Sequence, residues 1–493
     1  MNRFSGKSNP APSLRLIAAT VAIAGIAAFS GVASAVNPHR PIIASITPDF
    51  GSISGGTTVT FEGSNFKPPM TATFRGVAAT GCTIPTGPAN DQTFTCVTPA
   101  STVLGLVTVT VKNMANGNSG TLVIPNGFLY ACNTCSVSPV SALFEGMSPA
   151  GTTEPNGILE PGETSVAFSP AWFNASGVAF TGNAFTGNLS NPILPGGTLT
   201  IPIAQAQYPN LAAAAEGACT SCYALGASFT AGRPQVHVDA TVLETPSITG
   251  IADTADAHTW KIHIGNSFTD VPSSYLFYTH VERLVHNEVT FGTGGGLYSP
   301  DNTTPRIQMA GFLARSAAGG DGNVPFFGTI SSAENPVVNG AYNCTSGGTS
   351  LYNDVTPADA FCRYVHYITK LNVTNGCDAN IPPDYCQFAD VTRLVMSIFV
   401  ARAIVTPGGD ALVPDANVGT GTFATRSYDC VNGPAPFTDV ALGTFGCKHI
   451  GFIWTLGVVD GNGDGTFSPN ANVSRGQMAK FLVNAFNLSI NNP

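Results

Sequence analysis

The sequence predicts a multidomain protein in which an all-β N-terminal half is followed by an α-helical module of three repeats. Three observations predict this fold class. Apolar and polar residues alternate with a period of two in parts of the first half, and the second half repeats one pattern of residues three times. The length of 493 residues is also sufficient for about three domains.

Composition limits the class of function. Only 10% of the residues are charged, the net charge is −9, and 43% of the residues are hydrophobic. Such a chain lacks the basic surface that nucleic-acid phosphates require, so nucleic acid is not an expected partner. The apolar content excludes a disordered chain. We expect turn-rich β-structure with an uncharged polar surface.

The first 35 residues have the layout of a secretory signal peptide. Basic residues come first, an apolar run follows from 16 to 32, and Ala33-Ser34-Ala35 offers small residues for cleavage. The run is shorter than the ~20 residues that a membrane-spanning helix needs. Since no later run is long and apolar enough, we expect no transmembrane segment and predict a secreted protein.

Residues 41–131 are predicted to form short strands between turns, because threonine alternates with apolar residues at 57–61 and 107–111. The order of elements resembles the IPT/TIG family of immunoglobulin-like domains, from Ile46-Thr47-Pro48 through Gly63-Ser64-Asn65-Phe66 to Phe128-Leu129-Tyr130. The resemblance implies a β-sandwich that binds a protein or glycan ligand or acts as a spacer, without catalytic residues.

Residues 136–250 are also β-like, and we expect a second sandwich-like domain there. The run from Asn156 to Glu163 resembles a turn-initiating motif of bacterial surface sandwiches. Glu160 and Glu163 could form a carboxylate pair for acid–base catalysis. We interpret them instead as solvated turn residues, because nothing near them in the sequence marks a cleft.

The C-terminal half contains three copies of one unit, at 268–316, 352–403 and 437–486. Each copy begins with an aromatic residue two positions before an aspartate, and the starts are 84 and 85 residues apart. An arginine follows, with methionine at +3, phenylalanine at +6 and an aliphatic residue at +7, which lie on one face of a helix. The aspartates are Asp270, Asp354 and Asp439, and the arginines are Arg306, Arg393 and Arg475. We expect each unit to be helix, glycine-rich loop and helix, and the three units to pack together.

This pattern resembles the S-layer homology (SLH) domain, through the aromatic-x-Asp-Val start, the aromatic-Ser-Pro end of the loop and the Thr/Ser-Arg helix start. The resemblance implies a pseudo-threefold module that holds exported proteins to cell-wall polysaccharide or peptidoglycan at the cell surface. It implies that the three arginines lie between repeats and bind acidic groups of the glycan, and we assign the three aspartates to the structure of the repeat. The family's usual Thr-Arg-Ala-Glu run lacks its glutamate in all three copies.

The chemical properties of an arginine at the start of a helix are consistent with binding an acidic group. A guanidinium at a helix start adds five donors to the exposed N–H groups and the positive end of the helix dipole. This combination favours a carboxylate on the ligand.

Twelve cysteines in an exported chain predict disulfides. Cysteines at matching places in the second and third repeats, absent together from the first, behave as pairs, and other cysteines share one loop. The predicted pairs are Cys344–Cys362, Cys430–Cys447, Cys377–Cys386 and Cys82–Cys96. The two CxxC units, Cys132/Cys135 and Cys219/Cys222, favour disulfides over a zinc or redox site, with local or crossed pairing open.

Two functions from different classes remain. The first is a non-enzymatic cell-envelope protein that is anchored by the repeats and projects its β-domains. The second is an anchored carbohydrate-active enzyme with its catalytic unit in 136–250, which an acidic cleft there would favour. We favour the first, because the sequence has no nucleophile elbow, phosphate loop or HExxH motif. A third possibility is an S-layer subunit that self-assembles into a lattice, which the low charge permits but the sequence does not show.

Neither a cofactor nor a metal is expected. The run Asp460–Gly465 resembles a calcium loop, but position twelve is Ala471 where a bidentate glutamate is required. The eight histidines do not cluster in the sequence. His258 and His263 border a probable strand near Trp260, where a metal site is the less favoured alternative.

Overall fold

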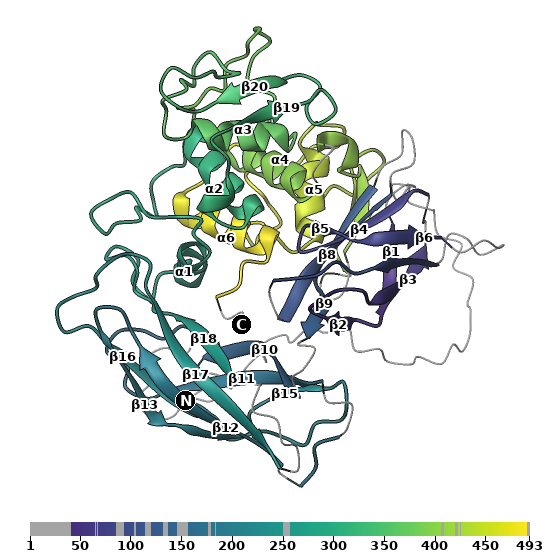
Figure 1. The fold of residues 1–493 in the computed structure, drawn as a ribbon. Coiled ribbons are helices and arrows are strands. Elements are labelled where there is room, and N and C mark those ends of the chain that lie inside the picture. Colours follow the sequence, from purple (N-terminus) through teal and green to yellow (C-terminus); the bar gives the residue numbers. More distant parts are fainter. Residues whose placement is uncertain are drawn as a thin grey trace, which may run out of the picture. The chain divides into compact units, whose positions relative to one another are not determined.

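The structure is a computed structural model that describes residues 41–490, except 65, 67, 85–92, 103–104, 114–119, 132–136, 145–155, 176–178, 183, 250–256, 406–408, 420–422 and 424. The predicted signal peptide, Cys132 and Cys135 lie outside the described residues. Within the described ranges, no helix has the length and apolar character needed to cross a bilayer. Figure 1 labels the strands and helices in chain order.

The first domain is a β-sandwich, as the IPT/TIG resemblance predicts. One sheet has the order β1 (Ile42–Thr47), β3 (Thr58–Ser64), β7 (Thr93–Val97), β6 (Thr80–Thr83). The other has the order β2 (Phe50–Ser52), β9 (Gly120–Ala131), β8 (Gly105–Asn113), β4 (Met70–Phe74), β5 (Val77–Ala78). Every second residue of β8 is buried, which is the period-two pattern that its sequence predicts. The core is aromatic, and Phe61 stacks on Phe94 at a centroid distance of 4.4 Å.

The second domain also contains two sheets (Figure 1). The first has the order β10 (Val137–Phe144), β11 (Val166–Asn174), β16 (Tyr223–Ser228), β13 (Thr198–Ile203), with β15 (Glu216–Ala218) on β11. The second has the order β14 (Gln205–Gln207), β12 (Phe185–Ile193), β17 (Asp239–Ile248), β18 (His258–His263). Since β18 pairs with β17 along its whole length, this domain continues past residue 250, where the sequence analysis ends it.

A carboxylate lies in the middle of the second core. Glu244 of β17 is fully buried and accepts hydrogen bonds from Tyr208 Oη (2.5 Å), Tyr223 Oη (2.7 Å) and Trp260 Nε1 (2.6 Å). Burial raises its pKa, although the donated hydrogen bonds act in the opposite direction. One carboxyl group therefore serves as the shared acceptor for the hydroxyl and indole N–H groups of three buried aromatic residues.

The C-terminal module holds two helices from each predicted repeat. They are α1 (Tyr278–His286) and α2 (Arg306–Ala318), α3 (Cys362–Lys370) and α4 (Arg393–Ile404), and α5 (Cys447–Thr455) and α6 (Arg475–Phe486). The second helix of each repeat packs on the first helix of the next, α2 on α3, α4 on α5, and α6 back on α1. The second helices also contact one another, so the three repeats close into a ring around a shared core.

Short elements connect the repeats. The 3₁₀ turn η1 (Asp321–Asn323) and the hairpin β19 (Phe327–Ile330)–β20 (Gly340–Asn343) precede the second repeat. The turn η2 (Gly409–Leu412) and the hairpin β21 (Ala416–Val418)–β22 (Ser427–Asp429) precede the third. Asp321 of η1 pairs with Arg315 and Arg363, and Asp410 of η2 with Arg402, so ion pairs tie these connections to the helices.

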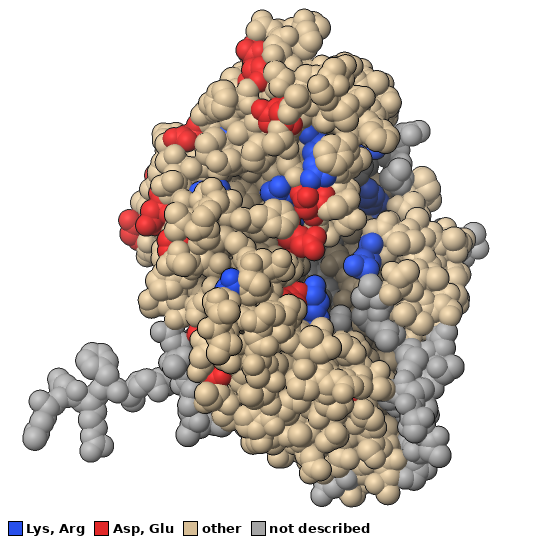
Figure 2. Space-filling view, turned by 60° about the vertical axis from the view of Figure 1, so that its left-hand side comes forward, with Lys and Arg blue, Asp and Glu red and all other residues tan. Residues whose placement is uncertain are grey.

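Five disulfides are present among the described residues. Four join Cys82 to Cys96, Cys344 to Cys362, Cys377 to Cys386 and Cys430 to Cys447, which are the four predicted pairs. The fifth joins Cys219 to Cys222, so this CxxC unit is closed locally and holds neither zinc nor a crossed partner. Figure 2 shows few charged side chains on the face drawn there, in keeping with the low charge of the sequence.

Candidate functional site: the junctions between repeats

The aspartate of each repeat makes hydrogen bonds to the end of the glycine-rich loop. Asp270 accepts hydrogen bonds from the backbone N–H groups of Tyr298 (2.8 Å) and Ser299 (2.7 Å). Asp439 does the same for Phe467 and Ser468. The residue after each loop aromatic has a positive φ of 56° to 58°, a conformation that costs free energy for a residue with a side chain. The aspartate therefore holds the backbone at the end of the loop.

The second repeat varies this contact by one residue. Asp354 accepts from the N–H groups of Tyr385 (2.6 Å) and Gln387 (3.1 Å). The residue between them is Cys386, which is tied to Cys377 by the disulfide of this longer loop. The aspartate keeps its role although the loop is longer than in the other repeats.

Replacing Asp270 with asparagine is expected to lower the free energy of unfolding of the module by about 1–2 kcal/mol, because an amide NH₂ would face one of the two N–H donors. Chemical denaturation measures this loss. Asp464→Asn is the control, since Asp464 lies in the equivalent loop of the third repeat but, among the described residues, bonds to no neighbour other than Thr466. Equal midpoints for the two variants would contradict the anchoring role.

Each arginine of the repeat motif lies at the junction with the next repeat and contacts its loop aromatic. Arg306 Nε donates to Tyr385 O (2.8 Å), and its guanidinium lies 4.8 Å from the centroid of the Tyr385 ring and 5.0 Å from that of Phe399. The repeated aromatic and the repeated phenylalanine at +6 therefore enclose the arginine of the preceding repeat. Cation–π contacts of this kind favour a guanidinium between rings.

The other two junctions repeat the arrangement. Arg393 Nε donates to Phe467 O at 2.6 Å, and Arg475 Nε donates to Tyr298 O at 2.7 Å. Arg393 lies over Phe467 (4.4 Å) and Arg475 over Tyr298 (4.6 Å). The contact of Arg475 joins the third repeat to the first and closes the ring.

The three arginines are buried, with exposed fractions of 8%, 8% and 4% for Arg306, Arg393 and Arg475. Burial lowers the pKa of Arg393 and of Arg475. Arg475 Nη1 donates to Gln308 Oε1 at 2.6 Å, whereas Arg306 Nη2 is buried without a hydrogen-bond partner. The three arginines therefore make the same hydrogen bond from Nε, but the partners of their Nη atoms differ between junctions.

One expectation from the sequence is wrong: the first N–H groups of the second helices are not exposed for a ligand. The N–H of Arg306 donates to Ala389 O, that of Arg393 to Ala471 O and that of Arg475 to Asn302 O, at 2.8–2.9 Å. The neighbouring loop thus satisfies the donors that a helix start leaves open. These N–H groups are therefore not open to a ligand, which leaves the arginine side chains as the donors that the sequence singles out.

The structure also corrects the description of Glu160 and Glu163. Both belong to a turn, as predicted, but each is only 4% exposed and neither is solvated. Glu163 Oε2 accepts the backbone N–H of Glu160 (2.8 Å), and Glu160 Oε1 accepts from Asn156 Nδ2 (2.7 Å). The carboxylates hold the turn together, because the N–H groups of the turn need acceptors once they are buried.

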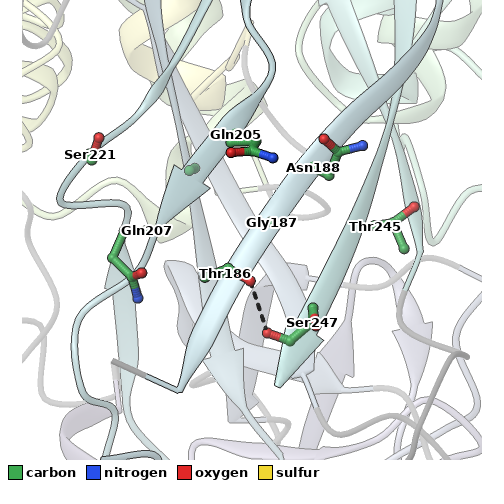
Figure 3. A pocket seen from close by; sticks show the side chains of 9 residues that line it. Thr186, Gly187, Asn188, Gln205, Gln207, Ser221, Thr245 and Ser247 are labelled. Atoms are coloured by element: carbon green, nitrogen blue, oxygen red, sulfur yellow. Dashed lines mark hydrogen bonds between the residues drawn. The ribbon is translucent and has the colours of Figure 1, made fainter. Parts of the chain in front are cut away.

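A shallow pocket of about 480 Å³ lies on the second domain, along β14, β12 and β17 (Figure 3). Its lining side chains are uncharged, and Thr186 Oγ1 donates to Ser247 O. Gly187 forms part of the lining, and a Cβ there would come within 2.1 Å of Tyr223 Oη beside Glu244. The pocket offers hydrogen-bonding groups but no titratable group for acid–base chemistry.

Two family models match parts of the chain. A model described as the IPT/TIG domain matches residues 41–124, and one described as the S-layer homology domain matches residues 267–310 and 436–479. The second model thus matches the first and third of the three predicted repeats. The middle repeat lies outside its matches, although Arg393 makes the same contacts as its counterparts. No curated protein matches the chain.

Two of the solved structures that match the chain are distant from it. A fragment of titin is 11% identical with a TM-score of 0.15, over 45% of this chain and 97% of the titin chain. A variant of an endo-fucoidan hydrolase from glycoside hydrolase family 107 is 12% identical with a TM-score of 0.14, over 48% of this chain and 30% of that one. Scores this low carry no argument about fold or activity. From the family models, the chain combines an IPT/TIG domain with S-layer homology domains, and the latter indicate a protein that is anchored at the cell surface or envelope.

Proposed function

We propose that this chain is a secreted cell-envelope protein, held without a covalent bond to wall polysaccharide or peptidoglycan by its three-repeat helical module. The N-terminal β-domains serve as a spacer or as a binding head. The chain itself has no catalytic role.

One observation carries the proposal: the junction arginines are buried cations that make no direct ion pair, although Asp439 and Asp270 are close enough to raise the pKa of Arg393 and of Arg475 against the effect of burial. Within the described ranges, no carboxylate oxygen lies within 4.0 Å of the guanidinium nitrogens of Arg306, Arg393 or Arg475. An unpaired buried charge is costly, and aromatic rings offset only part of this cost. An acidic group of a wall glycan would supply the direct ion pair that the described residues do not provide.

The geometry at the first junction adds a donor for such a ligand. Arg306 Nη2 has no partner, and a guanidinium binds a carboxylate through two parallel hydrogen bonds. Since Nη2 is covered in this structure, a ligand reaches it only when the side chain shifts outward. Three equivalent junctions in one module would increase the overall affinity through multivalency.

The role without catalysis is supported by the second domain. Trp172, Trp260 and Phe168 fill its core, and the two glutamates that could have acted as an acid–base pair accept hydrogen bonds within their own turn. An assay for release of reducing sugars from wall material by the full chain tests this part of the proposal, and release would contradict it.

Sedimentation of the full exported chain with purified wall sacculi, under oxidising conditions, tests the anchor. We expect the wild-type chain in the pellet. A triple variant, Arg306→Lys, Arg393→Lys and Arg475→Lys, keeps the charge and loses the planar fork, so it should bind roughly 10- to 100-fold more weakly. Sacculi stripped of their secondary polymers separate a polysaccharide ligand from peptidoglycan.

Lys370→Ala is the matched control, because Lys370 is a more exposed cation of the same module and pairs only with Glu334 at 3.6 Å. Circular dichroism establishes that each variant is folded. Wild-type affinity in a folded triple variant would remove the arginines from the proposal, and a wild-type chain that stays in solution would contradict the anchor itself.

A further inference from the structure

Three histidines and an aspartate converge beside the first helix of the module. Asp239 is the first residue of β17 and His237 precedes it by two residues, while His263 is the last residue of β18 and His286 the last residue of α1. One ligand atom from each of the four lies within 4.8 Å of the others. Asp239 Oδ1 is 3.3 Å from the Nδ1 atoms of both His263 and His286, and its Oδ2 is 3.0 Å from His237 Nε2.

The rings are arranged around a common centre and are not stacked on one another. Their centroids are 5.4–5.9 Å apart, with interplanar angles of 39° to 80°. Zinc takes four nitrogen and oxygen ligands in a tetrahedron with bonds of about 2.0–2.1 Å, which places ligand atoms roughly 3.3 Å apart. The four side chains therefore need only small shifts to meet this geometry.

A second carboxylate fixes one of the rings from behind. His263 Nε2 lies 2.7 Å from Glu282 Oε2, and Glu282 is fully buried and also accepts from Ser267 N (2.9 Å) and Ser267 Oγ (2.6 Å). This contact leaves Nδ1 directed at the cluster. A carboxylate behind a ligating histidine is the usual outer support of a metal site.

Two of the histidines have their imidazoles available. His237 Nε2 is buried and makes no well-directed hydrogen bond, although it lies close to Asp239. His286 Nδ1 faces only Asp239 Oδ1 among the described residues, at 3.3 Å, and the contact is long for a hydrogen bond.

Lys261 is the competing cation. Its Nζ lies 2.8 Å from Asp239 Oδ2, but the side chain is 54% exposed and can turn into solvent. In the described part of the chain, the other group of this kind is Cys344, Cys362 and His366, whose cysteines are already joined in a disulfide.

We propose that His237, Asp239, His263 and His286 form a structural site for one divalent transition-metal ion, with zinc as the first candidate. Three imidazoles and one carboxylate complete a four-coordinate shell with no open position, which is typical of structural and not of catalytic zinc. The ion would cross-link β17, β18 and α1.

Titration of the full chain, freed of metal with a chelator, with Zn²⁺ and with Co²⁺ alone tests the site. We expect one tight equivalent, absorption bands of tetrahedral Co²⁺, and a metal-dependent rise in Tm. The double variant His237→Asn and His286→Gln should bind at least about 100-fold more weakly while its metal-free Tm stays near that of the wild type. Lys261→Ala should bind as well as the wild type or better, because it removes the competing cation.

Three results would overturn the proposal. One is a wild-type chain that takes up neither ion at micromolar concentrations. Another is a folded double variant that binds with wild-type affinity, which would place the ion elsewhere. A destabilised Lys261→Ala variant without any metal binding would show that the cluster is only a network of ion pairs.

Discussion

Replacement of Arg475 by alanine is expected to lower the free energy of unfolding of the helical module by about 3–5 kcal/mol. The change removes a buried side chain between Tyr298 and Phe312 and leaves Tyr298 O and Gln308 Oε1 without their donor. It also removes one of the contacts that join the third repeat to the first. For a module of this size the loss corresponds to a fall in Tm of roughly 10 °C.

Calorimetry of the full chain measures this effect on the transition of the module. Arg475→Lys should be destabilised much less than Arg475→Ala, because the aliphatic stem of lysine still fills the space between the two rings although its ammonium group cannot reproduce the donors of the planar guanidinium. Lys370→Ala serves as the control and should shift the Tm little, since surface ion pairs contribute ~0–1 kcal/mol. A shift of the same size in Arg475→Ala and in the control would contradict the structural role of the junction.

The second large effect is expected at Glu244 in the second domain. Glu244→Ala leaves Tyr208 Oη, Tyr223 Oη and Trp260 Nε1 without their shared acceptor, and we expect a loss of about 3–5 kcal/mol. Denaturation followed by tryptophan fluorescence measures it, because Trp260 reports directly on this core. Thr245→Ala, at the next and exposed position of β17, should change stability by less than ~0.5 kcal/mol.

The same residue predicts a dependence on pH. Burial raises the pKa of Glu244 above its ordinary value of 4.5, so folding favours the protonated carboxyl group. Its contribution to stability is fully present below that ordinary value and is lost as the pH rises through the raised pKa. Glu244→Gln cannot ionise and should flatten this part of the profile. An unchanged slope in the variant would assign the dependence to other groups.

The sequence predicted the features that repeat or alternate. The three arginines, the three aspartates and the columns of aromatic residues could be aligned because each occurs in every copy, and the structure places them at equivalent junctions. The same comparison could not show that Tyr385 and Phe399 enclose Arg306, because the partners belong to a different repeat. Contacts between copies leave no spacing signal within one copy.

Features that depend on single long-range contacts were not predicted. Glu244 is an isolated acidic residue in a strand, and nothing near it in the sequence indicates three buried donors. His237, His263 and His286 lie on three separate segments, so the cluster exists only because β17 pairs with β18 and α1 lies against them. Glu160 and Glu163 were judged by local composition, which indicates a turn but not its burial.

Closure of the ring has a consequence for the number of units the module can contain. In an open solenoid, a unit can be added or deleted because each contacts only its neighbours and the end units are capped. Here α6 of the third repeat packs on α1 of the first, so no repeat has an end face without a neighbour. Deleting one unit, or duplicating one in tandem, would leave an arginine without its aromatic pocket and two apolar faces without a partner. Copy number is therefore fixed at three by geometry, and change is confined to the loops and hairpins between the units.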